Sequence, residues 1–426
     1  LLLYVVVNLT SILYLGAIAV SGISGLSITG CMAGLAVFAI VITLGGMKVI
    51  GYTDVIQVLV LIIGGLMTTY LAFDMVADKF GSDGALAGFN LTMQHADDHF
   101  HMIFDRNNPN YMDLPGLSIL IGGMWIVNLN YWGCNQYITQ RALGADLNTA
   151  RSGILFAAFL KLLMPVIVCL PGIAAYVLHQ QGMFQTEMMQ DGEVNPDRAY
   201  PILLQLLPIG MKGLAFAALT AAIVASLAGK ANSISTIFAL DIYKKKINPD
   251  ASEEKLVFIG RRAVWVAMAV AVLIAPFMGI DKKGGFQYIQ EYTGFVSPGI
   301  FAMFLLGFFW KKTTSSAALF ATIGGFILSV FFKFLPKIMD LSFLASTGFS
   351  KQNSDGVYEI PFIDRMGFVF LICVIVMYVM SITELKGRDN PKGLEIDSSM
   401  FRTSPGFTVG ALIVTGVIVA LYTILW

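Results

Sequence analysis

The sequence predicts an all-α polytopic membrane protein, and two observations support this prediction. Of the 426 residues, 57% are hydrophobic and only 13% are charged, whereas soluble domains carry about 25% charged residues. The apolar residues also gather in runs of about 20 residues, the length that a helix needs to cross a bilayer. We expect helices because a chain in lipid must satisfy its own backbone hydrogen bonds, and because the runs lack the alternation of barrel strands.

Eleven apolar runs are long enough to span a membrane. They lie at 1–22, 28–47, 54–77, 115–136, 153–178, 211–242, 257–280, 286–310, 316–336, 361–383 and 405–426. The first run opens the chain without Met, a basic flank or a cleavage site, so it does not resemble a signal peptide. We therefore expect the natural protein to begin further upstream. The connections are short enough that we expect a single transmembrane domain, residues 1–426, without a separate soluble domain.

The charges in the loops orient the predicted helices. The connection 74–113 is acidic, whereas Lys and Arg gather in 141–151, 243–262, 311–312 and 386–402. Because basic loops stay in the cytoplasm, these four loops should lie inside and the C-terminus outside. Lys+Arg and Asp+Glu number 27 each, so no basic excess favours a nucleic-acid partner. The lipid bilayer is the partner that the composition predicts.

The fourth run carries polar side chains where lipid would favour apolar ones. Its stretch WIVNLNYWGCNQY, residues 125–137, contains Asn128, Asn130, Asn135 and Gln136. A buried amide without a partner costs a few kcal/mol, so these side chains should face a cavity, a ligand or another helix. A hydroxyl-rich substrate and hydrogen bonding between helices are the two alternatives.

Three more runs contain features that point to a polar interior. Lys161 lies about two turns inside GILFAAFLKLL, where it either has a function or extends its ammonium toward the membrane surface. The stretch FQYIQEYTGFVSPGI is typical of a helix that bends at Gly294 and Pro298, with or without lining a polar site. The small residues and hydroxyls of AALTAAIVASLAGKANSISTIF allow close helix packing or supply oxygens to a cation such as Na⁺.

With these blocks, the chain resembles the sodium/solute symporter family, nearest to bacterial members of its sodium/glucose branch. The resemblance runs in order through VNLTSILYLG, GYTDVIQV, NYWGCNQYITQR, GILFAAFLKLL, NSISTIFALDIYK, QYIQEYTGFVSPGI and LLGFFWKKTT. It implies a leucine-transporter-like core of five-plus-five inverted repeats in a cell membrane, the inner membrane of a bacterium. Residues 1–77 would then be the last three helices of the first repeat, 115–310 the second repeat, and 316–426 additional C-terminal helices.

The resemblance implies transport rather than covalent chemistry, so no enzyme activity is expected. The implied function is symport of a sugar such as galactose or glucose by alternating access, with the sodium ion as coupling ion. Symporters of the same family for inositol, sialic acid, an amino acid or a small anion are the alternatives. A transporter-like sensor or a channel is the alternative from a different class.

The resemblance also assigns the sugar site residue by residue. The implied sugar contacts are Asn128, Lys161 and Gln290. Tyr131 corresponds to the aromatic residue that closes the site from inside, with Trp132 as its neighbour, and Phe286 corresponds to an outer gate. From the residues alone, Tyr131 and Trp132 fit an interfacial aromatic belt as well.

The implied sodium site departs from the family pattern. Where the family's galactose transporter has two adjacent serines, this chain has Ala225 and Ser226. Ala222 corresponds to a ligand that acts through its backbone carbonyl. Asp54 corresponds to a carboxylate along the sodium exit path, although Thr53 and Asp54 would also suit the cap of the third helix. For Ser226, the alternative is a hydrogen bond to its own helix.

Overall fold

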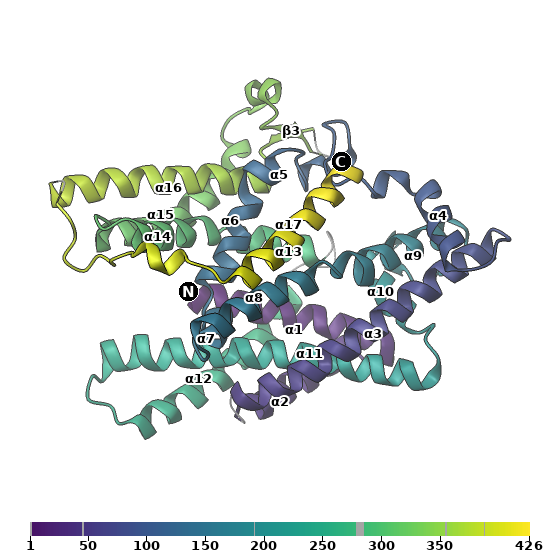
Figure 1. Cartoon of the computed structure of the whole chain (residues 1–426), viewed down its shortest axis with the longest axis horizontal. Coiled ribbons are helices and arrows are strands. Elements are labelled where there is room, and N and C mark those ends of the chain that lie inside the picture. Colours follow the sequence, from purple (N-terminus) through teal and green to yellow (C-terminus); the bar gives the residue numbers. More distant parts are fainter. Residues whose placement is uncertain (1, 45–46, 191, 278–284, 354–355, 387) are drawn as a thin grey trace. The chain divides into compact units, whose positions relative to one another are not determined.

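A computed structural model describes residues 2–44, 47–190, 192–277, 285–353, 356–386 and 388–426. The chain divides into two compact units. Figure 1 labels helices of both units. The first unit comprises Leu1–Phe100 and Ala157–Phe286, and the second comprises His101–Phe156 and Gln287–Trp426.

The first unit is built around the long helix α11 (Ile209–Thr236), which packs against α1, α2, α3 and α12. The small residues of α11 allow this close packing, since Ala225 and Ala228 are buried against Ile42 of α2. The helices of this unit are α1 (Leu2–Ser24), α2 (Ile28–Leu44), α3 (Met47–Lys79), α4 (Ala85–His95), α9 (Leu170–Gln180), α10 (Ala199–Leu204), α11 and α12 (Glu253–Ile274), with π-helical segments η4 (Pro165–Cys169) and η6 (Ile237–Ile247) and a hairpin of β1 (Met189–Gln190) and β2 (Glu193–Val194).

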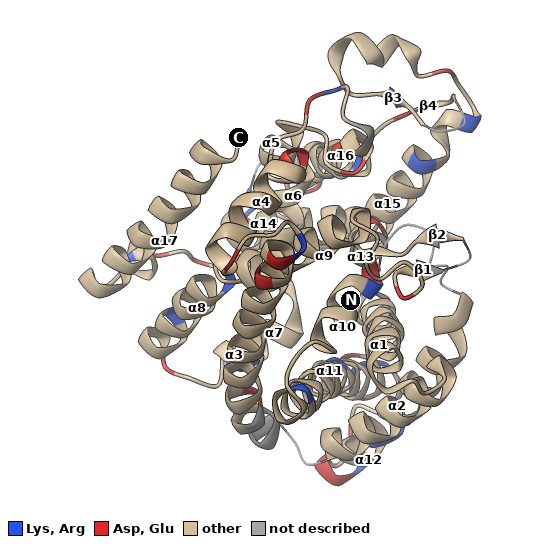
Figure 2. Cartoon of the chain, turned by 90° about the vertical axis from the view of Figure 1, so that its right-hand side faces the viewer, with Lys and Arg blue, Asp and Glu red and all other residues tan. Residues whose placement is uncertain are grey.

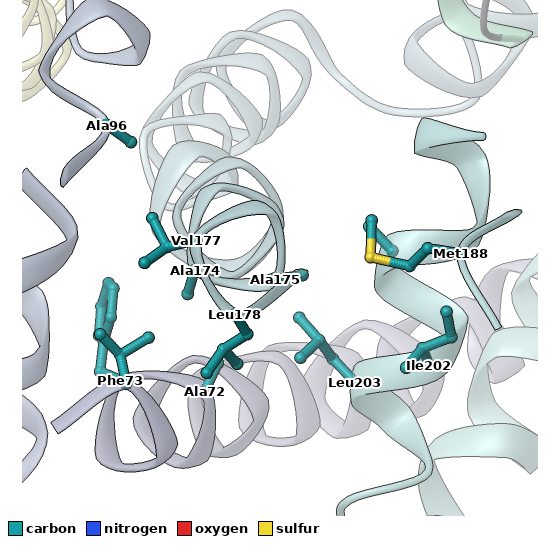
Figure 3. Packing of buried hydrophobic residues seen from close by; sticks show 12 residues of the cluster. Ala72, Phe73, Ala96, Ala174, Ala175, Val177, Leu178, Met188, Ile202 and Leu203 are labelled. Carbon is teal, nitrogen blue, oxygen red and sulfur yellow. The ribbon is translucent and has the colours of Figure 1, made fainter. Parts of the chain in front are cut away.

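A hydrophobic cluster joins α3, α9 and α10 within the first unit (Figure 3). Phe73 of α3, Val177 and Leu178 of α9 and Leu203 of α10 are at most 6% exposed. The helix α4 covers part of this cluster with the ring of Phe89, which meets Phe73 edge to face at 5.4 Å. The helix α4 lies within the connection 74–113 that the sequence predicts to be acidic, and it is too short and too polar to form a membrane span.

The second unit contains a group of three packed helices, α14, α15 and α16. Gly299 of α14 and Gly325 of α15 face each other so closely that a Cβ atom on Gly325 would lie 2.9 Å from the Cα of Gly299. The elements of this unit are α5 (Ser118–Ile121), α6 (Gly123–Leu129), the π-helical η3 (Asn130–Cys134), α7 (Gln136–Ala142), most of α8 (Leu147–Lys161) and of α13 (Gly285–Gly294), α14 (Ser297–Phe309), α15 (Ser315–Phe334), α16 (Phe362–Leu385), α17 (Pro405–Ile424) and a hairpin of β3 (Lys351–Gln352) and β4 (Tyr358–Glu359).

The helix α8 begins at a side-chain cap. Asp146 accepts hydrogen bonds from the backbone N–H groups of Asn148 and Thr149, each at 3.0 Å, and from the Thr149 hydroxyl at 2.5 Å. The bond from the Thr149 hydroxyl is the main cause that holds the pKa of Asp146 below its usual range. This cap places the start of α8 six residues before the predicted start of the run at 153–178.

Most of the predicted apolar runs coincide with helices. In the described residues, eight helices are long and apolar enough to cross a membrane, and two shorter apolar helices cover Ile28–Leu44 and Ser297–Phe309. Figure 2 shows that Lys, Arg, Asp and Glu are sparse along most of these helices. The predicted bend in 286–310 is confirmed, because α13 ends at Gly294 and α14 begins at Ser297.

The run at 115–136 differs from the prediction, because it is not one continuous helix. It consists of α5, α6 and η3, and α7 then carries the chain on to Ala142. Gly122 separates α5 from α6 with φ −89° and ψ −127°, a backbone conformation outside the helical region. Glycine tolerates this conformation at low cost, and apolar periodicity alone does not reveal such a break.

We predict that Gly299→Ala lowers the stability of the protein by about 1–3 kcal/mol, because the added methyl group has no room. A Cβ atom at this position would overlap the Ala321 carbonyl of α15. Gly307 lies on the same helix with no atom within 4 Å of its Cβ position, so Gly307→Ala is the matched control and should be neutral or stabilising. Thermal unfolding of both variants in detergent measures the difference, and equal unfolding temperatures would contradict the prediction.

Candidate substrate and ion sites

The fourth apolar run carries a π-helical turn, η3, between two regular helices. The π-helix widens the turn and leaves part of the regular hydrogen-bond ladder unmade, and such turns occur often at functional sites. Asn135 follows η3 and caps α7, since its side-chain oxygen accepts a bond from the N–H of Tyr137 at 3.2 Å. This cap explains one of the amides in the run as a structural group.

A second amide, Asn130, links η3 to α14. Its side-chain N–H₂ donates to the hydroxyl of Ser297 at 3.3 Å, and Asn130 is only 2% exposed. Ser297 in turn donates to the Thr293 carbonyl at 2.8 Å, and the Thr293 hydroxyl donates to the Gln290 carbonyl at 3.2 Å. This relay of hydrogen bonds connects η3 to the helix that carries Gln290, so Asn130 is the bridge between helices that the sequence left as an alternative.

Asn128 and Gln290 differ from these structural amides. Asn128 is exposed within the unit, and its N–H₂ donates to the Met124 carbonyl at 2.9 Å, which leaves its side-chain oxygen available as an acceptor. Gln290 is partly buried, and its side-chain amide makes no hydrogen bond to the residues that the structure describes. Both side chains therefore have hydrogen-bonding capacity left for a ligand.

Tyr131 and Trp132 lie within η3, between Asn130 and Asn135 in the sequence. Both are partly buried, and their rings meet edge to face with centroids 5.8 Å apart and an interplanar angle of 83°. Phe286 lies on α13, but its side chain falls outside the described residues.

Lys161 belongs to the first unit and ends the regular part of α8. Because α8 begins at Leu147, Lys161 lies about 20 Å along the helix axis, deeper than the two turns expected from the sequence. The π-helical η4 follows at Pro165, and the hydroxyl of Thr69 on α3 donates to the Val166 carbonyl there at 2.8 Å. Lys161 thus stands at a break in a membrane helix, and the Thr69 hydroxyl satisfies one carbonyl at this break.

The three residues implied in sodium binding lie together on α11. Ala222 and Ser226 are partly buried, and Ala225 is 6% exposed. On the same helix, Ser233 donates to the carbonyl of Gly229 at 3.2 Å. Ser226 makes no such bond, and its hydroxyl has no partner in the described part of the chain. The alternative that Ser226 bonds back to its own helix is therefore wrong.

Asp54 lies inside α3 and not at its start. The helix begins at Met47, seven residues earlier, so the alternative that Asp54 caps the third helix is wrong. The run predicted at 54–77 began too late because Lys48 and the polar residues near Thr53 interrupt the apolar pattern. Asp54 is a partly buried carboxylate within a membrane helix.

One charged residue near the ion candidates was missed. Lys230 of α11 is 2% exposed and lies one turn beyond Ser226. Its sequence signal was a single Lys in a run of apolar and small residues, the same signal that singled out Lys161.

The predicted site residues belong to two different units. The second unit carries Asn128, Tyr131, Trp132 and Gln290, and the first unit carries Lys161, Ala222, Ala225, Ser226, Asp54 and Phe286.

Membrane helices that break near polar residues are typical of secondary transporters. The chain belongs to the sodium:solute symporter family, whose profile matches residues 1–325. It is thus a multi-pass protein of the cell membrane from a family of sodium-coupled transporters.

Two relatives illustrate the range of the family. The chain is 45% identical over its whole length to the sodium/glucose cotransporter of Vibrio parahaemolyticus and covers 75% of that protein. Over 78% of its length it is 33% identical to the sodium/myo-inositol cotransporter 2 of Homo sapiens, of which it covers 51%.

A solved structure of a Na⁺-coupled sialic acid symporter, in a substrate-bound outward-open state, has a similar fold. The TM-score is 0.66 at 21% sequence identity, and the match covers 90% of this chain and 72% of that one. The likeness confirms the predicted leucine-transporter-like fold class.

We predict that Asn130→Ala lowers the stability of the protein by about 1–2 kcal/mol, because Asn130 is buried and hydrogen-bonded to Ser297. Asn128→Ala is the matched control, since Asn128 is exposed and bonds only to its own helix. Thermal unfolding in detergent measures both variants. An Asn130→Ala protein as stable as the wild type would show that the relay is dispensable.

Proposed function

We propose that this protein is a sodium-driven symporter that imports a sugar, galactose or glucose, by alternating access. The observation that carries the proposal is the 45% identity, over the whole chain, to a protein named sodium/glucose cotransporter. In such a cycle the sodium gradient supplies the free energy, and the central site opens to one side of the membrane at a time. Residues 115–310 form the second of two inverted repeats in this proposal, after 1–77 and before the additional helices in 316–426.

The sugar contacts in this proposal come from groups that match hydroxyls. Asn128 and Gln290 offer amide groups that are not used fully within the described chain. Amides both donate and accept, and the ammonium of Lys161 donates, so together they fit a neutral polyol. The Tyr131 ring covers the apolar face of the sugar, Trp132 supports that ring, and Phe286 closes the outer side.

The sodium contacts in this proposal come from α11. The hydroxyl of Ser226 and the backbone carbonyls of Ala222 and Ala225 supply oxygen atoms, the ligands that hard cations prefer. The hydroxyl of Ser226 is not engaged by its own helix, in contrast to that of Ser233. Asp54 lies on the path by which the ion leaves toward the cytoplasm.

A second candidate substrate is myo-inositol. The 33% identity to the human sodium/myo-inositol cotransporter 2 favours it over charged substrates. Inositol presents a ring of hydroxyls much as a hexose does, so the same amides suit it. A sugar panel distinguishes the two candidates.

Uptake into proteoliposomes tests the proposed function. Full-length protein is reconstituted, a sodium gradient is imposed, and labelled galactose, glucose and myo-inositol are compared. We expect saturable accumulation of galactose or glucose that disappears when potassium replaces sodium or an ionophore dissipates the gradient. Uptake that is the same without sodium would refute symport, and accumulation of myo-inositol alone would replace the proposed substrate.

We predict that Asn128→Ala and Gln290→Ala each weaken sugar binding by about 1–3 kcal/mol, because a buried sugar hydroxyl loses its partner. Neither change should lower the unfolding temperature, since neither amide joins two helices. Equilibrium binding of labelled galactose and thermal unfolding give the two readouts. Wild-type affinity in both variants would remove these residues from the sugar site.

A further prediction concerns the coupling ion. Ser226→Ala should abolish or sharply weaken sodium stimulation while equilibrium exchange of sugar continues, because the ion loses an oxygen that Ala225 cannot replace. Ala225→Ser should keep coupling or raise sodium affinity. Initial uptake rates measured against sodium concentration compare the variants, with Ser233→Ala on the same helix as control. If Ser226→Ala retains the wild-type sodium curve, the ion binds elsewhere.

A further inference from the structure

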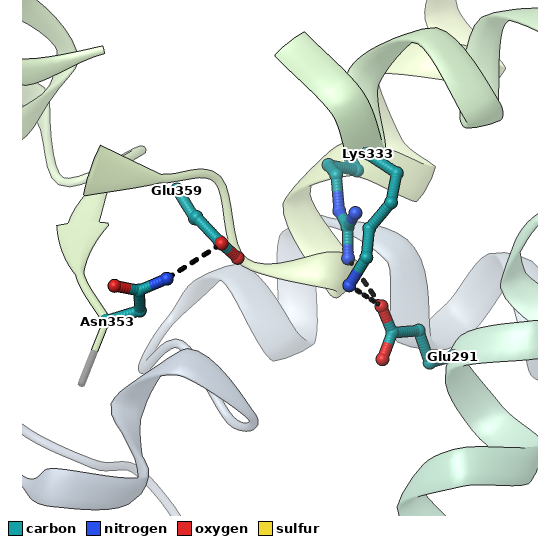
Figure 4. A network of polar contacts seen from close by, with 5 residues as sticks. Glu291, Lys333, Asn353 and Glu359 are labelled. Atoms are coloured by element: carbon teal, nitrogen blue, oxygen red, sulfur yellow. Dashed lines mark hydrogen bonds and ion pairs between the residues drawn. The ribbon is translucent and has the colours of Figure 1, made fainter. Parts of the chain in front are cut away.

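An ion triad of Glu291, Lys333 and Arg365 connects three helices of the second unit (Figure 4). One carboxylate oxygen of Glu291 accepts hydrogen bonds from the Lys333 ammonium at 2.6 Å and from the Arg365 guanidinium at 3.0 Å. The three side chains are 16%, 32% and 11% exposed, respectively. Because the triad is largely removed from water, each of its bonds is stronger than a surface ion pair.

The triad ties the short helix α13 to α15 and α16. At the junction after Gly294, Phe295 N–H donates to the Tyr292 carbonyl and Val296 N–H to the Thr293 carbonyl in tight turns, and the Ser297 hydroxyl donates to the Thr293 carbonyl. The helix α13 is therefore not a rigid continuation of α14, and a few residues at such a junction are enough to form a hinge. Glu291 lies one turn before this junction.

On the side of the triad, Gly294 at the end of α13 packs closely against Met366 of α16, where a Cβ atom would lie 2.6 Å from the Met366 sulfur. A small cavity there is lined by Glu291, Gly294, Phe295, Ser329 and Arg365, among others. Ser329 is 6% exposed, and its hydroxyl has no partner in the described part of the chain. Because side chains leave space here, the polar bonds of Glu291 determine where α13 lies to a greater degree than they would in a filled core.

Gln290 directly precedes Glu291 on α13, so any movement of the helix moves both residues. The Cα of Gln290 lies about 6 Å along the axis from the end of α13, so a tilt of about 20° would shift it by about 2 Å. A displacement of this size is enough to break a hydrogen bond to a bound ligand. The polar amide that the proposed sugar site uses therefore depends on the anchor next to it.

We propose that Glu291 is a positioning residue for the sugar site: bound to Lys333 and Arg365, it fixes α13 so that Gln290 meets the substrate. Glu291 does not touch the sugar in this account. The proposal rests on the proposed function, because it acts through Gln290. It also explains why one carboxylate serves two cations from different helices, since two anchors restrict a helix in more directions than one.

Galactose uptake and binding by Glu291→Gln, Gln290→Ala and the double variant test this proposal in full-length protein. We expect Glu291→Gln to raise the KM for galactose about tenfold, because the misplaced Gln290 amide loses a hydrogen bond whose net contribution corresponds to about that factor. In a protein that already carries Gln290→Ala, Glu291→Gln should raise the KM for galactose hardly any further, because the effects of residues that act through one another are not additive. Glu395→Gln breaks an exposed ion pair with Lys311 in the same unit and is the matched control.

The outcomes separate a positioning role from a merely structural one. A wild-type KM for Glu291→Gln, or effects of Glu291→Gln and Gln290→Ala that multiply, would overturn the proposal. If Glu291→Gln does not fold, the neutral triple variant Glu291→Gln, Lys333→Gln, Arg365→Gln removes the unpaired cations. The triple variant should fold with a raised KM, and a wild-type KM there would overturn the proposal. Failure of the proposed function is distinct, because the wild type itself would then show no sodium-driven uptake.

Discussion

The fold depends on one constraint: a chain that crosses hydrocarbon must satisfy its backbone polar groups within the protein. At the π-helical breaks η3 and η4, a polar side chain meets the exposed backbone or bridges to a neighbour. Asn135 caps the helix after η3, Asn130 bridges η3 to Ser297, and Thr69 donates to the Val166 carbonyl in η4. The breaks at η3 and η4 are thus stabilised by side chains of asparagine and threonine.

These breaks lie beside the residues proposed to bind substrate. Tyr131 lies within η3, Lys161 precedes η4, and Gln290 lies on the short helix before the junction with α14. A regular helix leaves no backbone group free and points its side chains in fixed directions, whereas a break redirects them. Breaks of this kind in secondary transporters line the substrate site, which agrees with the site proposed for this protein.

Small residues and buried charges provide the rigidity around the breaks. Gly299 and Gly325 let α14 and α15 approach almost backbone to backbone, which fixes the helices that surround the junction. The ion triad centred on Glu291 joins α13, on the other side of that junction, to α15 and α16. Close packing at glycine therefore fixes α14, whereas the ion pairs of Glu291 fix α13. The two halves of the span predicted at 286–310 thus differ in what stabilises them.

The sequence by itself determined the membrane class, the order of the helices and the bend at Gly294, because hydropathy and backbone chemistry are local properties. Only the tertiary structure decided which amides are structural. Asn128, Asn130 and Asn135 look alike in WIVNLNYWGCNQY, yet Asn130 bridges two helices, Asn135 caps one and Asn128 keeps a free oxygen. Partners such as Ser297 lie more than 160 residues away in the chain, so no local pattern could reveal them. The physical reason is that a hydrogen bond depends on where two groups meet in space.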